Sequence, residues 1–234
     1  MEDAVKKLPT GAFGLDSLLG GGIEPRMITQ FFGEAGSGKS TLCLMAAVEL
    51  LRSGRGVVYI DSEGFSIERF SQIAGDSTNE FAQRLFVFEP STFAEQGLMI
   101  SESERLIKSG AAGMIVVDSA TALYRVEQTN TKDALSMLSR QMMVLLGIAK
   151  RYDIPAVITN QVFMDIDHHR LSGLGGTALS HISKAIVRVE KHEGFRRAVL
   201  FKHRSQAEGT SWDFVLTGTG AKDRQPRLNT EKTA

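Results

Sequence analysis

The chain has 234 residues, 42% of them hydrophobic, a composition typical of a globular protein with one sizeable core and not of a disordered chain. Lysine plus arginine and aspartate plus glutamate number 27 each, so the formal net charge is zero and no global basic field indicates nucleic acid or an anionic membrane. Any DNA binding must therefore depend on a local patch.

Cysteine content and apolar run length bear on the cellular compartment. The single cysteine, Cys43, cannot form an intrachain disulfide, and its apolar neighbours favour a small buried side chain over a redox role. The longest apolar runs, such as residues 142–149, are shorter than the roughly 18 residues that a membrane span needs. The first residues contain no apolar signal core. We therefore expect a cytoplasmic protein that does not insert into membranes.

Predicted strands and helices alternate over the first two thirds of the chain. Apolar, β-branched runs predict strands at 27–33, 56–61, 84–89, 113–118 and 155–161. Three-four spacing and capping signals, including Ser66 and the pair Thr92 and Glu95, predict helices at 39–54, 67–75, 93–108 and 131–151. This alternation predicts an α/β fold with a mostly parallel sheet, flanked by helices on both faces.

The pattern changes in the last third. Residues 162–180 are polar and glycine-rich without a period, which predicts a long functional loop. Three closely spaced strand-like runs follow, AIVRVEK, AVLFKHR and WDFVLT, and they predict antiparallel strands added at the C-terminal edge of the sheet. We predict one domain over residues 9–222, between a short N-terminal tail at 1–8 and a C-terminal tail at 223–234.

A glycine-rich turn, GEAGSGKS, lies between the first strand and the first long helix. Its spacing G-x-x-x-x-G-K-[ST] is met by Gly33, Gly38, Lys39 and Ser40. The glycines allow backbone N–H groups to surround phosphate oxygens, Lys39 can reach the β- and γ-phosphates, and Ser40 can ligate Mg²⁺. The sequence therefore predicts a site for ATP and Mg²⁺ here.

Three polar residues end predicted strands on the side of the sheet where ligands bind in open α/β folds. Asp118 ends a buried strand and is placed to hold Mg²⁺ through water. Glu63 could activate water, although a solvated turn glutamate is the alternative. Gln161 could sense the γ-phosphate, although an ordinary strand-end hydrogen bond is the alternative.

Four segments taken together resemble a known family, the RecA-type strand-exchange recombinases of archaea and eukaryotes. In chain order they are PTGAFGLDSLLGGGIEPRMITQFFGEAGSGKSTL, YIDSEGFSIERF, VVDSATALYR and VITNQV, and the resemblance covers about residues 9–217. Only about eight residues precede PTG, whereas the main archaeal recombinase, RadA, carries an N-terminal helix-hairpin-helix domain and a polymerisation motif. The length resembles that of the short archaeal paralogues of RadA.

The resemblance implies a RecA-like P-loop NTPase core and a role as an auxiliary factor in homologous recombination and DNA repair. Such paralogues bind ATP and DNA, single-stranded or branched, hydrolyse ATP weakly and interact with RadA. Carried over by position, Lys39, Glu63 and Gln161 serve catalysis, and Ser40 and Asp118 serve the metal. The implied ATP-binding residues are Gly33, Glu34, Ala35, Gly36, Ser37, Gly38, Lys39, Ser40, Thr41 and Arg69, the last stacking on adenine unless it is a solvated helix arginine.

The DNA-binding loops of the family are only partly matched. The first, residues 125–137, lacks a GRG-like element and has only Arg125 and Lys132 as cations. The second, residues 162–176, keeps the glycines and contains Arg170. Lys132 and Arg170 are the candidate DNA contacts, with Lys184 and Arg188 as further possibilities. The DIDHHR segment at 165–170 could suggest a metal site, but adjacent ligands on a loop favour a solvated segment.

A final pattern is the KHR segment. Strand alternation places Lys202 and Arg204 on one face, like the KxR pairs of ring helicases and KaiC-like proteins that reach a neighbouring subunit's γ-phosphate. The pair could act within one chain or between chains of a homo-oligomer, and a solvated strand end is the alternative. Besides the auxiliary role, the sequence leaves open an active strand-exchange recombinase, a KaiC-like or ring-helicase-like ATPase, and a binding protein that ATP merely stabilises.

Overall fold

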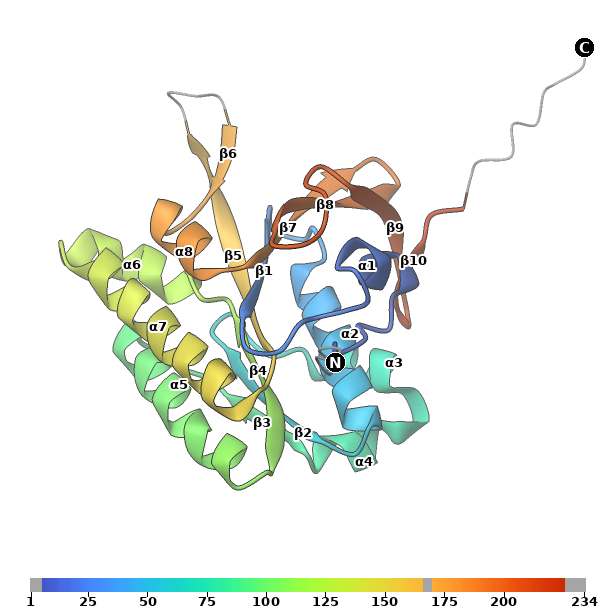
Figure 1. The fold of residues 1–234 in the computed structure, drawn as a ribbon, viewed down its shortest axis with the longest axis horizontal. Coiled ribbons are helices and arrows are strands. Elements are labelled where there is room, and N and C mark those ends of the chain that lie inside the picture. Colours follow the sequence, from blue (N-terminus) through green and yellow to red (C-terminus); the bar gives the residue numbers. More distant parts are fainter. Residues whose placement is uncertain (1–5, 166–169, 226–234) are drawn as a thin grey trace, which may run out of the picture.

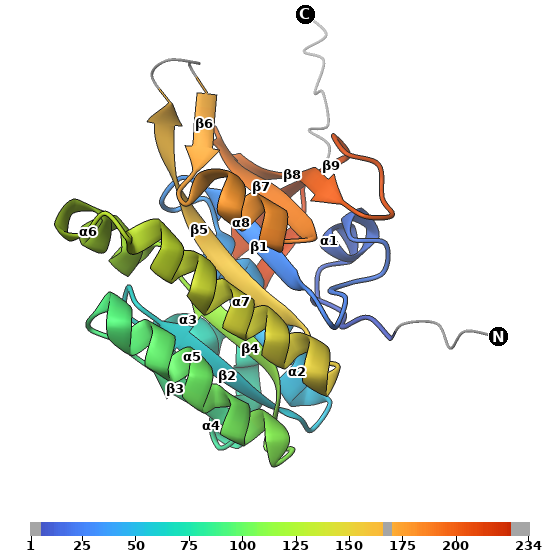
Figure 2. The ribbon, with the colours of Figure 1, turned by 60° about the vertical axis from the view of Figure 1, so that its left-hand side comes forward.

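A central sheet separates two layers of helices, as Figures 1 and 2 show from two sides. The structure, a computed structural model, describes residues 6–165 and 170–225. The strand order is β10-β9-β8-β7-β1-β5-β4-β2-β3, and β6 pairs with β5 off this path. The strands are β1 Ile28–Gly33, β2 Gly56–Asp61, β3 Leu85–Phe88, β4 Ala112–Asp118, β5 Ala156–Asp165, β6 Arg170–Gly173, β7 Ala185–His192, β8 Phe195–His203, β9 Ser211–Thr217 and β10 Gly220–Asp223.

Strand directions follow the prediction. The pairs among β1, β2, β3, β4, β5 and β7 are parallel, whereas β7–β8, β8–β9 and β9–β10 are antiparallel. The predicted α/β fold, with antiparallel strands at the C-terminal edge, is therefore confirmed. Because parallel strands all run the same way, the ends of β1, β2, β4 and β5 converge on one edge of the sheet.

Helices cover both faces because each central strand alternates its buried side chains between them. Val57 and Tyr59 of β2 face one core, and Val58 and Ile60 face the other. The first core contacts α1 Phe13–Leu18, α2 Lys39–Arg52, α3 Ile67–Ala74 and α4 Thr78–Ala82, the last preceded by a 3-10 turn, Gly75–Ser77. The second contacts α5 Phe93–Lys108, α6 Ala122–Asn130, α7 Ala134–Tyr152 and α8 Gly176–Ile182.

The predicted helix starts have their capping bonds. The Ser66 hydroxyl accepts the backbone N–H of Arg69 at 3.1 Å, and the Thr92 hydroxyl accepts that of Glu95 at 3.2 Å. The Glu95 carboxylate in turn accepts the backbone N–H of Ser91 at 2.7 Å. These bonds satisfy N–H groups that a helix start leaves unpaired, so α3 and α5 begin where the sequence indicated.

Two predicted loops are wrong. Residues 162–180 are not one irregular loop, because β5 continues to Asp165, pairs antiparallel with β6, and α8 follows. Figure 2 shows these paired strands extending beyond the main sheet. Residues 125–137 are likewise mostly helical, in α6 and the start of α7. The DIDHHR segment falls largely on residues 166–169, outside the described residues.

The predicted tails are shorter than expected where the structure describes them. Leu8 forms an antiparallel bridge with Ile23, and the Lys7 ammonium is 3.0 Å from the Glu24 carboxylate. At the other end, Asp223 still belongs to β10, and the Arg224 guanidinium lies 3.9 Å from the ring centre of Phe195. Residues 1–5 and 226–234 lie outside the described residues.

Candidate nucleotide site

The glycine-rich turn connects β1 directly to α2, as predicted. A Cβ on Gly33 would lie 2.1 Å from the carbonyl oxygen of Val189, so the neighbouring strand β7 leaves no room for a side chain there. Gly38 precedes the first helical residue with φ of 108°, a conformation that glycine adopts without strain. The turn therefore leads its backbone N–H groups into the start of a 14-residue helix, where the helix dipole favours an anion.

Lys39 folds over this turn. Its ammonium donates hydrogen bonds to the carbonyl oxygens of Gly33 and Glu34, each at 2.9 Å. Burial lowers the pKa of Lys39, an effect that the nearby carboxylates of Asp118 and Glu63 oppose. The cation is thus held at the mouth of the turn by weak neutral acceptors, which a phosphate oxygen could replace with a charge-assisted bond.

A cavity of about 410 Å³ brings most of the predicted site together. The lining residues are Gly33, Ala35, Gly36, Gly38, Lys39, Ser40, Thr41, Glu63, Asp118, Arg125, Gln161, Val162 and Leu216. Of the residues expected at the site, Glu34, Ser37 and Arg69 lie outside this lining. Elements far apart in sequence therefore supply one surface, namely the ends of β1, β2 and β4, the middle of β5 and the start of α2.

Asp118 is held by two hydroxyl donors that sequence analysis missed. The Tyr59 hydroxyl donates to Oδ2 at 2.8 Å, and the Thr159 hydroxyl donates to Oδ1 at 2.5 Å. All three side chains are buried, and burial together with Asp118 raises the pKa of Tyr59 well above its ordinary value. The carboxylate is fixed toward the cavity that Ser40 also lines, and such an oxygen donor set fits Mg²⁺.

Asp61, at the end of β2, is a second carboxylate that the sequence analysis did not select. It is opposite Asp118 in the β2–β4 ladder, and only 7% of it is exposed. Its Oδ1 accepts the backbone N–H groups of Glu63 and Gly64 at 2.8 and 2.7 Å. Burial raises the pKa of Asp61 to about 6, against the effect of these two bonds. Asp61 therefore shapes the turn that carries Glu63.

Glu63 and Gln161 meet across the cavity. The Gln161 amide donates to Glu63 Oε1 at 2.7 Å, although the residues are 98 positions apart in sequence. Neither side chain is fully buried, so both reach the open part of the cavity. This contact places a carboxylate that can accept a proton beside an amide that can donate a hydrogen bond. Lys39 lines the same cavity.

The backbone of Gln161 belongs to a further set of hydrogen bonds. Its N–H donates to the hydroxyl of Thr121 at 3.1 Å, and its carbonyl oxygen accepts the N–H of Leu174 at 2.9 Å. The Thr121 hydroxyl donates to the Asn160 side chain at 2.9 Å, and Asn160 donates to the carbonyl of Leu174 at 2.9 Å. The middle of β5 is thereby tied to both the start of α6 and the segment after β6.

Arg69 lies beside the turn and is half-buried. Its guanidinium donates to the carbonyl oxygens of Thr217 at 2.7 Å and Gly220 at 3.2 Å, and its Nε to the Thr41 hydroxyl at 3.4 Å. The arginine therefore joins α3 to the start of α2 and to the β9–β10 turn. This position is compatible with an adenine contact, because the flat guanidinium lies next to the predicted triphosphate loop.

The candidate DNA contacts are dispersed. Lys132 is exposed between α6 and α7. Arg170 is the first residue of β6, and its side chain is not among those that the structure describes. The Lys184 ammonium donates to the carbonyl of His181, and Arg188 pairs with Glu190 at 2.7 Å.

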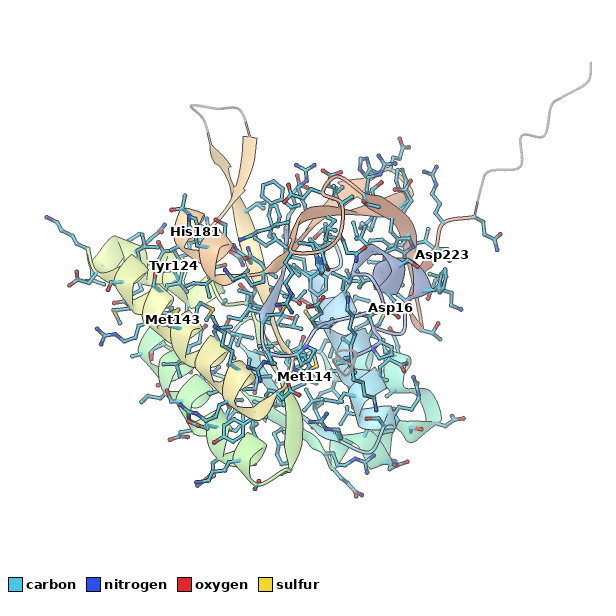
Figure 3. All side chains as sticks on the ribbon, viewed as in Figure 1. Asp16, Met114, Tyr124, Met143, His181 and Asp223 are labelled. Carbon is cyan, nitrogen blue, oxygen red and sulfur yellow. The ribbon has the colours of Figure 1, made fainter. Side chains whose placement is uncertain are left out.

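A second cavity, of about 670 Å³, lies between α6, the middle of β5 and the start of α8. Its lining includes Tyr124, Arg125, Val162 and Thr177. Figure 3 shows Tyr124 beside the helix that carries His181.

Lys202 and Arg204 are remote from the nucleotide cavity. Lys202 is level with Ile186, which is next to Gln30 of β1, so it lies toward the end of β1 opposite the glycine-rich turn. Its ammonium donates to the carbonyl oxygens of Ser180 and Ser183, whereas the Arg204 guanidinium pairs with Glu24. This placement contradicts the alternative in which the pair folds back onto a nucleotide of the same chain.

None of the described helices combines the length and the apolar character that crossing a bilayer requires. Over the same part of the chain, no three His, Cys, Asp or Glu side chains gather in a way that could bind a metal ion.

Comparison with known proteins identifies relatives over almost the whole chain. The Rad51 family model matches residues 2–224. The DNA repair and recombination protein RadB of Methanoculleus marisnigri is 57% identical over 218 residues, which are 92% of this chain and 97% of the relative. That of Methanococcoides burtonii is 43% identical over 226 residues, 95% of this chain and 100% of the relative. A crystal structure of the RadB recombinase superposes with a TM-score of 0.82 at 39% identity, covering 93% of this chain and 100% of that one.

Proposed function

The chain belongs to the Rad51 family, and we propose that it is an ATP-dependent accessory protein of DNA repair and homologous recombination. Its RadB relatives, similar over nearly their full length, carry the name DNA repair and recombination protein. The resemblance of the sequence to the short archaeal paralogues of RadA points to the same role. In this role the protein binds ATP and DNA, hydrolyses ATP slowly and assists the main recombinase.

One observation supports the nucleotide part most strongly. Lys39, Ser40, Asp118, Glu63 and Gln161 come from four different parts of the chain and line one cavity. A tight turn that happened to contain a lysine would not require a buried, doubly hydrogen-bonded carboxylate and a Glu–Gln pair opposite it. This arrangement is the one that phosphoryl transfer to water needs, namely phosphate binding, a metal ligand and a group that accepts a proton.

The proposed roles follow from the contacts. The backbone N–H groups from Gly33 to Thr41 bind phosphate oxygens, and Lys39 exchanges its carbonyl partners for them. Ser40 and Asp118 hold Mg²⁺, which neutralises phosphate charge when it is bound. Glu63 orients a water molecule and accepts its proton, while the Gln161 amide fixes the Glu63 carboxylate. Arg69 contacts the adenine.

DNA binding and partner binding form the second part of the proposed function. We place the DNA contacts at Lys132 and Arg170, because both belong to segments that follow the nucleotide residues in the chain. Gln161 links these segments to the nucleotide through its bonds with Thr121 and Leu174. Bound ATP would therefore order the surface that meets DNA or RadA, and hydrolysis would release it.

The first experiment tests nucleotide binding. Lys39→Ala should abolish tight binding of a fluorescent ATP analogue, because the site loses the cation that contacts the β- and γ-phosphates. Lys150→Ala, an exposed lysine on α7, is the matched control and should bind like the parent. Unchanged affinity in folded Lys39→Ala would refute the assignment of the site.

The second experiment separates the proposed role from its alternatives. ATP turnover is measured with and without single-stranded DNA. A slow rate that DNA does not change supports the accessory role, whereas strong stimulation by DNA favours an active recombinase or a ring-helicase-like ATPase. Tight ATP binding without any turnover would indicate a protein that ATP merely stabilises.

A further inference from the structure

Arg125 lines the same cavity as the candidate catalytic pair, Glu63 and Gln161, a position that sequence analysis did not recognise. Helix α6 is fixed at its start because the hydroxyl of Thr121 accepts the N–H of Gln161 at 3.1 Å. The N–H of Arg125 donates to the carbonyl of Thr121 at 3.0 Å, so Arg125 lies one helical turn further on the same face. Its side chain lines the nucleotide cavity together with Glu63 and Gln161.

The charges lining this cavity are balanced only when Arg125 is included. The ionisable lining side chains are the cations Lys39 and Arg125 and the carboxylates Glu63 and Asp118. Without Arg125, a site with one net negative charge would have to bind the magnesium complex of ATP, which is itself negative. Arg125 supplies the charge that removes this repulsion from the lining of the cavity.

The Arg125 guanidinium is available for a ligand. The side chain is exposed, and among the described side chains, which exclude those of residues 163–172, it has no hydrogen-bond or ion-pair partner. By contrast, Arg69, Arg188, Arg197 and Arg204 each have a protein partner. A guanidinium without a protein acceptor beside a phosphate site is free to bind a phosphate in two-point fashion.

We propose that Arg125 binds the terminal phosphate of the nucleotide from within the same chain, and so distinguishes ATP from ADP. This inference rests on the nucleotide site of the proposed function and adds a residue to it. Because α6 is tied to Gln161 through Thr121, a γ-phosphate would meet Gln161 and Arg125 together. The same side chain borders the second cavity, and a contact with nucleic acid there is the competing role.

The test compares two nucleotides in four proteins. Magnesium-dependent affinities for β,γ-imido-ATP and ADP are measured for the parent, Arg125→Gln, Arg125→Lys and Lys150→Gln. Lys150, an exposed lysine on α7, is the matched control, because its substitution changes charge equally and, in the described part of the chain, it lines neither cavity. Arg125→Gln should weaken the ATP analogue about tenfold and ADP less than about twofold, because a charge-assisted phosphate contact is lost. Arg125→Lys should restore part of the difference, and Lys150→Gln should leave both affinities unchanged.

Other outcomes would contradict the role of Arg125, and they differ according to whether the nucleotide site itself also fails. Equal weakening of both nucleotides, or of neither, by Arg125→Gln would overturn it while leaving the nucleotide site intact. Loss of single-stranded DNA binding with an unchanged preference for ATP would assign Arg125 to the second cavity instead. If the parent binds neither nucleotide, the proposed function fails first and this inference with it. Thermal unfolding of Arg125→Gln confirms that the comparison concerns folded protein.

Discussion

Asp61→Asn should stabilise the protein at neutral pH. Asp61 is buried opposite Asp118, and its carboxylate accepts two backbone N–H groups from the turn that carries Glu63. Burial raises its pKa from the ordinary 3.8 to about 6, so the native state holds this proton more tightly than the unfolded state. The amide of asparagine keeps the accepting oxygen and has no charge to bury, so both bonds to the turn can remain.

The magnitude and its pH dependence follow from linkage. The unfolded state loses the proton near pH 3.8 and the native state near pH 6, so the parent loses stability as pH rises through this window. The full loss corresponds to about 3 kcal/mol, at about 1.4 kcal/mol for each pKa unit. Asp61→Asn should therefore gain up to about 3 kcal/mol over the parent at pH 7.5, and considerably less at pH 4.5.

The assay is urea unfolding of parent and Asp61→Asn at pH 4.5 and 7.5 in EDTA, so that bound metal does not contribute. Asp76→Asn, at an exposed acid in the 3-10 turn, controls for the change in net charge. A gain that is the same at both pH values would refute the reasoning, because linkage requires it to grow with pH. Destabilisation at pH 7.5 would show that the negative charge itself is needed by the turn.

Four further changes test other parts of the molecule. Glu63→Gln should keep ATP binding and lower turnover about 100-fold in a steady-state phosphate-release assay, because an amide cannot accept the proton; a parent-like rate would make Glu63 a turn residue only. Asp118→Asn should shift the magnesium titration of nucleotide binding to higher concentration, and overlaying titrations would count against its role. Gly33→Ala should cost about 3 kcal/mol in urea unfolding, since the added Cβ would lie 2.1 Å from the Val189 carbonyl oxygen, and a neutral effect would mean that β7 can move away. Replacing Lys132 and Arg170 with alanine should reduce the slope of log DNA affinity against log salt by up to about two, and an unchanged slope would place the phosphate contacts elsewhere.

The parts of the molecule that the sequence predicted well are those where one local pattern determines both structure and chemistry. The turn from Gly33 to Ser40 combines a strand, a fixed glycine spacing and a helix start, so its position and its role followed together. Asp118, Glu63 and Gln161 were found because they end apolar strands, and parallel strands bring their ends to one edge of a sheet. Their convergence in one cavity follows from this rule, whereas the Glu63–Gln161 hydrogen bond was not predicted.

The parts that were missed depend on contacts between distant residues or on weak local signals. The hydroxyl donors of Asp118, Tyr59 and Thr159, lie inside apolar strands 59 and 41 positions away from it, and nothing local marks them as its partners. Helix α6 buries only Tyr124, so it lacks the apolar stripe by which helices are recognised, and residues 125–137 were assigned to a loop. Past Gln161, β5 continues because it pairs with β6. The local sequence contains no pattern that predicts this pairing.

The KHR segment shows why a motif needs its strand register before it can be given a role. Its spacing alone favoured a phosphate contact, but β8 runs antiparallel to β7, which carries Lys202 and Arg204 away from the end of the sheet where β1 meets the turn. There Arg204 and Lys7 neutralise Glu24, which is only 6% exposed in its side chain. Burial alone would raise the pKa of Glu24, yet hydrogen bonds from these two cations hold it below its ordinary value. Arg204→Ala should therefore destabilise the protein by about 1–2 kcal/mol in urea unfolding while the folded variant keeps its rate of ATP turnover. A large fall in turnover with unchanged stability would instead mean that the pair reaches a nucleotide on a neighbouring chain, and mixing this variant with Glu63→Gln should then restore activity.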